Sequence, residues 1–215
     1  MTGAPWLAFG EGRITLLVRS PPDGSTPLRA SHPTLLAANR AVTTHRDAML
    51  TQWMAWLGER ITGTPNTPRD LVAMEFGLIL DTFATLVGPL RRETKAVWNQ
   101  VTEFYGRHAA ARGLAAGEVV EEMQYLRELL IRFLSAEMVQ LRPRKGMALF
   151  LRLNRLVDRG VAMAVVGYTN AMVATLLPPG DEGPAATFVD LEAIRARLDL
   201  MRTDLEQIGR VNSTT

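Results

Sequence analysis

The sequence predicts an all-α fold, an up-and-down bundle of four or five helices followed by a C-terminal coiled-coil helix. Apolar residues recur at every third or fourth position from residue 33 onward, which is the spacing of one helix face. Helix-terminating pairs such as Gly88-Pro89 and Arg142-Pro143 divide these segments. The predicted connections are only a few residues long, which favours antiparallel neighbours in a bundle.

Residues 1–31 are predicted to form a loosely ordered N-terminal arm. Prolines occur there among glycine, serine and aspartate, and only residues 13–19 have a β-like pattern. The first nine residues contain neither a basic region nor a long apolar stretch, so we expect no signal peptide. The helical bundle is predicted to occupy residues 32–177.

Two helices are predicted in the first half of the bundle. An apolar stripe runs along the first of them until Ile61, before a turn at residues 62–66. The stripe contains Val42, Met49, Trp53, Trp56 and Leu57. The second helix is predicted to start with Thr67 as N-cap, Pro68 at the first helical position and Asp70 at the third. These residues suit the unpaired amides and the positive dipole of a helix start.

Three further helices are predicted at about residues 93–112, 117–141 and 144–177. The first of them carries several large side chains on one face: Trp98, Val101, Tyr105 and His108. The last is the longest and contains no charged residue between Gly160 and Leu177. Charged residues upstream and small polar residues within this stretch favour a buried central helix over a membrane span.

The C-terminal helix is predicted at residues 188–210, after a Pro- and Gly-rich linker at residues 178–187, and it carries a continuous apolar seam. The seam consists of Leu191, Ile194, Leu198, Met201, Leu205 and Ile208. Because fewer than three heptads are not stable as an isolated pair, pairing should depend on what the helix connects. We expect a homodimer built partly by this coiled-coil signalling helix. A globular head with such a stalk indicates a detached input module of a signalling protein.

Composition and motifs exclude several kinds of site. The chain has no cysteine, which excludes disulfides, thiolate metal sites and cysteine nucleophiles. Its histidines fall in different segments without metal-ligand spacing, so we expect no metal site. Basic residues between positions 142 and 159 alternate with leucines and lack base-stacking aromatics, so we expect no nucleic-acid binding. No nucleophile motif or marked carboxylate pair occurs, and we expect no enzymatic activity.

A ligand pocket or polar core is predicted among the third, fourth and fifth helices. The candidate residues are Trp98, Tyr105, His108, Tyr125, Arg127, Asp158 and Tyr168. Arg127 lies at the edge of the buried stripe of its helix, so its guanidinium should pair with a carboxylate. Asp158 is the preferred partner because the fifth helix carries it beside the uncharged stretch.

His108 shares an apolar face with Trp98 and Tyr105, and three interpretations are open. The preferred one is a buried structural histidine that bonds Tyr105 or a main-chain carbonyl and needs no cofactor. The first alternative is an axial ligand in a sensor of haem or another tetrapyrrole. The second is a phosphate-accepting histidine in a phosphotransfer protein.

One short pattern spans the end of the third helix and the start of the fourth. It has a histidine, an arginine, a turn, and then a helix with a glutamate and a Leu-Arg pair: His108, Arg112, Glu122, Leu126 and Arg127. This pattern resembles the N-terminal domain of RsbT co-antagonist proteins of the RsbRD type, over about residues 33–177. The segment from Leu156 to Tyr168 resembles the last bundle helix of that family. Such domains are similar to globins that have lost haem, so the resemblance implies a globin-like bundle.

The resemblance also implies a function. It implies a bacterial, cytoplasmic sensory domain of stress-response signal transduction, usually placed ahead of a STAS, histidine kinase or helix-turn-helix output. We therefore expect a missing output domain or a signalling protein partner, with neither a membrane nor nucleic acid as partner. The expected role is a non-enzymatic regulatory input domain that transmits a ligand- or partner-induced change through its C-terminal helix.

Overall fold

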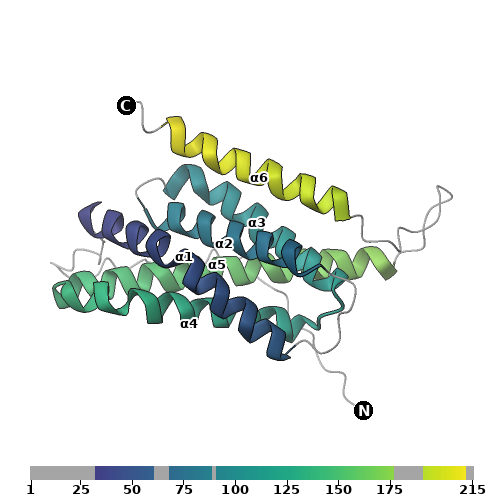
Figure 1. The fold of residues 1–215 in the computed structure, drawn as a ribbon, viewed down its shortest axis with the longest axis horizontal. Coiled ribbons are helices and arrows are strands. Elements are labelled where there is room, and N and C mark those ends of the chain that lie inside the picture. The colour runs from purple at the N-terminus through teal and green to yellow at the C-terminus, as the bar shows by residue number, and fades with distance from the viewer. Residues whose placement is uncertain (1–31, 61–67, 89–90, 177–190, 212–215) are drawn as a thin grey trace, which may run out of the picture.

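The structure, a computed structural model, describes residues 32–60, 68–88, 91–176 and 191–211, and these form six α-helices without a β-strand (Figure 1). The helices are α1 (His32–Arg60), α2 (Arg69–Val87), α3 (Arg91–Ala111), α4 (Ala116–Gln140), α5 (Pro143–Leu176) and α6 (Leu191–Val211). The predicted all-α fold is confirmed, and the helix boundaries lie within a few residues of the predicted ones. The arm at residues 1–31, the linker at 178–187 and Thr67 lie outside the described residues.

Successive helices run in alternating directions, as the colour gradient shows (Figure 1). α3 and α5 make the most extensive contact, α4 packs on α5 and α1, and α2 packs on α1 and α3. α6 lies along α2 and α3 on one side of the bundle. The described helices thus have the predicted up-and-down arrangement.

α2 is buried around its whole circumference. Every residue from Glu75 to Leu80 is buried. Because successive helical residues point about 100° apart, this run covers every direction around the helix axis. Its neighbours α1, α3 and α6 provide the cover. α2 is therefore the central helix of the fold.

α5 is buried on one face only, which corrects the expectation that its uncharged stretch is a buried central helix. Gly160, Ala164 and Gly167 are buried on the side that meets α3. By contrast, Val173 is 49% exposed and Leu176 is 79% exposed. The reason is that small residues admit α3 on one face, whereas the other face is open to solvent. None of the described helices has the length and apolar character needed to cross a membrane.

The contact between α3 and α5 depends on two glycines. A Cβ atom on Gly106 would overlap the carbonyl group of Ala164, and one on Gly167 would overlap the carbonyl group of Glu103. The two backbones therefore touch, and a side chain at either glycine would push the helices apart.

The apolar seam of α6 faces the bundle of its own chain. Leu198, Met201 and Leu205 are buried, while the seam residues nearer the helix ends are half-buried against the same core. An ion pair between Arg195 Nη2 and Asp70 Oδ2, 2.9 Å apart, also joins α6 to the start of α2. The side chains predicted to pair with a second chain are thus already covered within one chain.

Candidate functional site: a buried polar cluster

A cluster of ionisable side chains is enclosed where α2, α3 and α4 meet, and it is the candidate functional site. The polar cluster consists of Glu75, Tyr105, His108, Arg112 and Glu122, each at most 3% exposed. Burying an ion without compensation costs several kcal/mol, so such a cluster persists only when its members satisfy one another. Two contacts between helices provide this compensation.

The local sequence places three members of the polar cluster on one side of the C-terminal end of α3. Tyr105 and His108 lie in the last turns of α3, and Arg112 follows its last residue with the same helical spacing, because its N–H bonds the His108 carbonyl. Gly113 then ends α3 in the left-handed conformation, with φ of 81°, which other residues rarely adopt. This tight helix end turns the chain directly into α4 and brings Glu122 opposite Arg112.

The first contact joins α3 to α2. His108 Nδ1 lies 2.8 Å from Glu75 Oε2. An ionised carboxylate only accepts hydrogen bonds, so in a contact with ionised Glu75 the ring hydrogen lies on Nδ1. No described residue bonds to His108 Nε2 or to Glu75 Oε1, although both atoms are buried. The expected partner of His108, Tyr105 or a main-chain carbonyl, is replaced by Glu75, and the Tyr105 hydroxyl donates to Glu122 instead.

The second contact joins α3 to α4. Arg112 Nη2 donates to Glu122 Oε2 at 3.0 Å, and Nη1 lies 3.5 Å from Oε1. The hydroxyl of Tyr105 donates to the same carboxylate. The Arg112 guanidinium also lies 5.7 Å from the centre of the Tyr105 ring, a cation–π distance. Glu122 thus holds Tyr105 of α3 and Arg112 directly after it, and a movement of α4 would disturb both.

Burial and charge shift the pKa values of these three groups. Burial raises the pKa of Glu122 against the opposing effect of the Arg112 charge. Burial also raises the pKa of the Tyr105 hydroxyl well above its ordinary value, and the Glu122 charge adds to this shift. Burial acts to lower the pKa of Arg112, but the charges of Glu122, Tyr105 and Glu75 and the hydrogen bond to Glu122 together outweigh it, and the pKa is raised. Tyr105 and Arg112 therefore keep their protons at neutral pH.

Formal charges in the polar cluster do not cancel when His108 is neutral. Glu75 and Glu122 each carry a negative charge when ionised, against the single positive charge of Arg112. The contact of His108 with Glu75 joins α3 to α2 within this cluster. Among the described residues, no group of three or more histidine, cysteine, aspartate or glutamate side chains could hold a metal ion.

Other predicted site residues lie outside the polar cluster. Trp98 lies two turns before Tyr105 on α3, and its Nε1 donates to a main-chain carbonyl of α5 at 3.1 Å. Tyr125 on α4 stacks on a tryptophan of α1, with ring centres 4.6 Å apart. Tyr168 on α5 is half-buried against the hydrophobic core. Of the seven candidates, only Tyr105 and His108 meet in the polar cluster.

The predicted contact between Arg127 and Asp158 does form, and it links α4 to α5. The two side chains are 25% and 61% exposed, so the predicted partner is present and the predicted buried environment is wrong. Arg127 starts at the edge of the buried stripe, and its long side chain carries only the end of the guanidinium to the surface, whereas Nε stays buried.

Periodicity alone does not select Glu75, Arg112 and Glu122 for the polar core. Arg112 and Glu122 occur in the family pattern, but their burial depends on the angle between α3 and α4. Glu75 is the only charged residue between Leu71 and Leu80. A lone carboxylate in an otherwise apolar helix is the signal that could have found it, because buried carboxylates need partners.

No protein-family model matches the chain, and no curated protein or solved structure matches it. The resemblance to RsbRD-type domains therefore enters the functional argument as a hypothesis.

Proposed function

We propose that the chain is a non-enzymatic sensory or regulatory input domain, in which α6 transmits the state of the bundle to a second copy or to a signalling partner. The observation that carries the proposal is the burial of Leu198, Met201 and Leu205 against α2 and α3. These side chains also form an a/d seam, so one apolar surface has two ways to be buried.

The two arrangements of α6 compete for the same side chains. In the docked arrangement the seam packs on α2 and α3, and in the paired arrangement it packs on the seam of a second copy. Both arrangements remove the seam from water, but only the docked one also covers the apolar surface of α2 and α3, so pairing must offset the exposure of that surface. A ligand or partner that prefers one bundle geometry by a few kcal/mol can then shift the balance.

The polar cluster is placed to influence this balance. α2 and α3 carry Glu75 and His108, and the same two helices form the surface on which α6 docks. A ligand or partner that separates Glu75 from His108 would weaken the attachment of α2 to α3. Any resulting shift of these helices changes the fit of α6. This coupling is the physical route that we propose from the bundle interior to the output helix.

Two features support a regulatory role over a catalytic one. The polar cluster is at most 3% exposed at each residue, so a substrate could reach it only after the helices separate. In addition, Arg112 and Glu122, two of the residues that resemble the RsbRD-type pattern, bond directly to each other. The resemblance further suggests a bacterial, cytoplasmic, dimeric protein of stress-response signalling, which acts on a partner or an output domain.

Cysteine labelling tests the proposal, because the natural chain contains no cysteine. Met201 is buried in the docked arrangement and lies at a d position, where facing thiols can form a disulfide in a parallel pair. The variant Met201→Cys should resist maleimide when α6 is docked and form a disulfide-linked dimer as the protein concentration rises. Leu200→Cys is the matched control, because Leu200 is 51% exposed on the opposite face and should label at once.

The labelling result separates three cases. Protection of Met201→Cys at low concentration, with cross-linking at high concentration, supports two competing arrangements. Protection without cross-linking at any concentration overturns pairing with a second copy, and transmission to a signalling partner is then the only form of the proposal that stands. Labelling of Met201→Cys as fast as that of Leu200→Cys removes the docked arrangement and also overturns the proposal.

A haem or tetrapyrrole sensor is the second candidate function, and one observation favours it. His108 Nδ1 contacts the Glu75 carboxylate, which leaves Nε2 without a described partner. Iron-ligating histidines are commonly oriented in this way by a carboxylate on the other ring nitrogen. An absorption spectrum after mixing with haemin tests this function: a Soret shift that is absent in His108→Ala would support it, and an unshifted spectrum would exclude it.

A further inference from the structure

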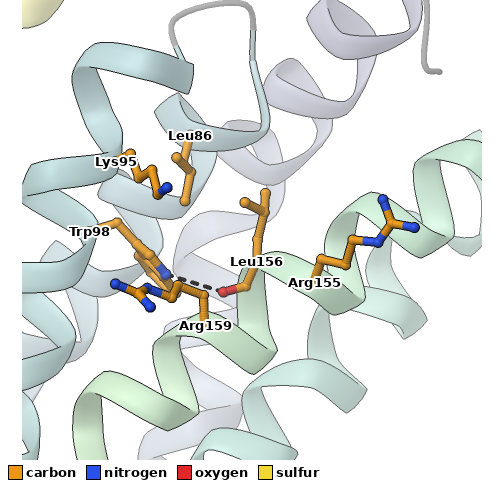
Figure 2. A pocket seen from close by; sticks show the side chains of 6 residues that line it. All are labelled: Leu86, Lys95, Trp98, Arg155, Leu156 and Arg159. Atoms are coloured by element: carbon orange, nitrogen blue, oxygen red, sulfur yellow. Dashed lines mark hydrogen bonds between the residues drawn. The ribbon is translucent and has the colours of Figure 1, made fainter. Parts of the chain in front are cut away.

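The hollow where α2, α3 and α5 meet offers no apolar surface to a ligand. It is bordered by Leu86 and Trp98, which are both 0% exposed. Figure 2 shows the Trp98 ring against α5, where its Nε1 donates to the Leu156 carbonyl. The side chains that remain accessible around this hollow are cations at the surface, so it is not a binding site.

A second hollow, the hairpin groove, lies at the turn from α4 into α5, at one end of the bundle (Figure 1). Its volume is about 340 Å³. Its apolar side chains come from the end of α4 and the start of α5: Met138, Val139, Leu141, Pro143, Met147 and Phe150. All of them are exposed or half-buried, and Val139 is 83% and Met147 51% exposed. The hairpin groove therefore presents accessible apolar surface.

The turn holds the two walls of the hairpin groove together. The N–H of Leu141 bonds the Met138 carbonyl at 3.2 Å, and the N–H of Gly146 bonds the Arg142 carbonyl at 3.0 Å. A Cβ atom on Gly146 would lie 3.0 Å from the Met138 carbonyl oxygen, so the start of α5 packs closely on the end of α4. Behind the groove, Leu149 is buried in the core and anchors this end of α5. The groove is therefore formed by the fold itself.

The border of the hairpin groove is basic. From residue 138 to residue 157 the sequence contains five basic residues and no acidic one. Three of them, Arg142, Arg144 and Lys145, are exposed in the turn and the first turn of α5. The nearest carboxylate along the chain is that of Glu137, before this stretch. A partner that carries carboxylates is attracted to such a border, and a basic partner is repelled.

We propose that the hairpin groove binds an acidic amphipathic helix of a partner protein. The large apolar side chains of that helix enter the groove, and its carboxylates meet Arg142, Arg144 and Lys145. Amphipathic helices bind apolar grooves through anchors about one turn apart. The methionines suit this role because a flexible thioether side chain adapts to differently shaped anchors. Arginine and lysine both pair with carboxylates.

The shape and charge of the hairpin groove favour this occupant over two others. Met138, Leu141 and Phe150 are half-buried in the groove, where the side chains of a helix can reach and a flat lipid surface cannot. A second copy of the chain would bring the same basic border to the contact, and the two borders would repel each other. The proposal does not rest on the docking of α6.

Fluorescence anisotropy with a labelled peptide of about four helical turns tests the proposal. In this Glu/Leu peptide, leucine recurs at every third or fourth position and glutamate fills most of the others. We expect it to bind the wild-type chain with a Kd of about 100 µM or tighter. A scrambled peptide of the same composition should bind about fivefold more weakly or worse, because its leucines do not share one face. A peptide with lysine in place of each glutamate should not bind measurably.

Variants of the chain locate the binding. Met147→Ser should weaken binding of the Glu/Leu peptide about fivefold or more, because it removes part of the apolar wall. Met172→Ser is the matched control, because Met172 is 40% exposed farther along the same helix and should not affect binding. Lys145→Gln should weaken binding about threefold, whereas Lys95→Gln, at the exposed lysine of α3, should not. Far-ultraviolet circular dichroism checks that each variant remains helical.

Four results would overturn the proposal. The first is a wild-type chain that does not bind the Glu/Leu peptide at millimolar concentration. The second is an equal loss of affinity in Met147→Ser and Met172→Ser, which places the binding elsewhere. The third is equal affinity for the glutamate and lysine peptides, which removes the role of the basic border. The fourth is co-sedimentation with phosphatidylglycerol vesicles that Met147→Ser abolishes, which assigns this surface to a membrane.

Discussion

Arg112 and Glu122 form a buried ion pair across the turn between α3 and α4, with Nη2 and Oε2 3.0 Å apart and both side chains at most 3% exposed. The Tyr105 hydroxyl donates to the same carboxylate. Because water cannot replace a lost partner at this depth, the three groups depend on one another more strongly than any surface pair of the bundle does.

The first prediction is that Arg112→Met lowers the free energy of unfolding by about 3 kcal/mol or more, because it leaves the Glu122 carboxylate buried without its cation. The double variant Arg112→Met/Glu122→Met should recover part of this loss, since it removes both charges. Arg132→Met is the control, because Arg132 forms an exposed pair with Glu128 and should cost about 0.5 kcal/mol or less. Urea denaturation measures all three. Equal losses in Arg112→Met and Arg132→Met would contradict the buried pair.

The second prediction concerns stability at alkaline pH. The folded pKa of Tyr105 is raised well above 10, so the unfolded chain releases this proton at a pH where the folded chain keeps it. The contribution of Tyr105 to stability is therefore complete below about pH 10 and is lost as pH rises further. The loss amounts to up to about 1.4 kcal/mol per pH unit. Tyr105→Phe should show a correspondingly shallower fall in the free energy of unfolding between about pH 10 and 11.5. Parallel curves for the two proteins would show that Tyr105 is not shielded from solvent.

The third prediction concerns the pair of Arg127 and Asp158. A buried pair would make Arg127→Ala cost about 3 kcal/mol, but the observed exposure of 25% and 61% reduces the expected cost to about 1 kcal/mol or less. A thermal melt at low and at high salt measures this. A large fall in the melting temperature of Arg127→Ala that is the same at low and at high salt would place the pair in the interior instead.

The difference at Arg127 illustrates what periodicity can and cannot predict. The spacing of apolar residues locates Arg127 at the edge of a buried stripe, but the side chain is long enough to reach solvent from that edge. For Glu75 the limit is different. Its isolation among apolar residues indicates burial, but its partner His108 is 33 residues away on another helix, so the pair depends on tertiary packing.

The C-terminal helix illustrates a second limit. The seam spacing correctly predicts a helix with one apolar face, and Leu198, Met201 and Leu205 are buried as expected. Spacing alone does not distinguish a partner helix of a second copy from the bundle of the same chain, because both offer an apolar surface. The choice depends on α2, whose full burial requires a neighbour on the side where α6 lies.

The fourth prediction concerns the contact of α3 with α5. Gly106→Ala should unfold the bundle or lower its free energy of unfolding by several kcal/mol, because the added Cβ would overlap the main chain at Ala164. Gly117→Ala is the control, since no atom lies within 4 Å of a Cβ at that position of α4. It should be neutral or stabilising by up to about 1 kcal/mol, because alanine favours helices. Similar melting temperatures for both variants would rule out the close approach of the two backbones.

The last prediction tests whether α6 docks on its own bundle in solution. Leu198 is 1% exposed in the docked arrangement, whereas Leu200, two residues away, is 51% exposed. Leu198→Ala should therefore lower the free energy of unfolding by about 2–4 kcal/mol through lost burial and a cavity, and Leu200→Ala by about 0.5 kcal/mol or less. Both variants make the same change in the same helix, so differences in helix propensity cancel. Urea denaturation at low protein concentration makes the comparison without contributions from pairing, because a dimer dissociates on dilution whereas an intramolecular contact does not. Equal small effects would mean that the seam is not held by α2 and α3, and the proposed competition between docking and pairing would then lose its docked arrangement.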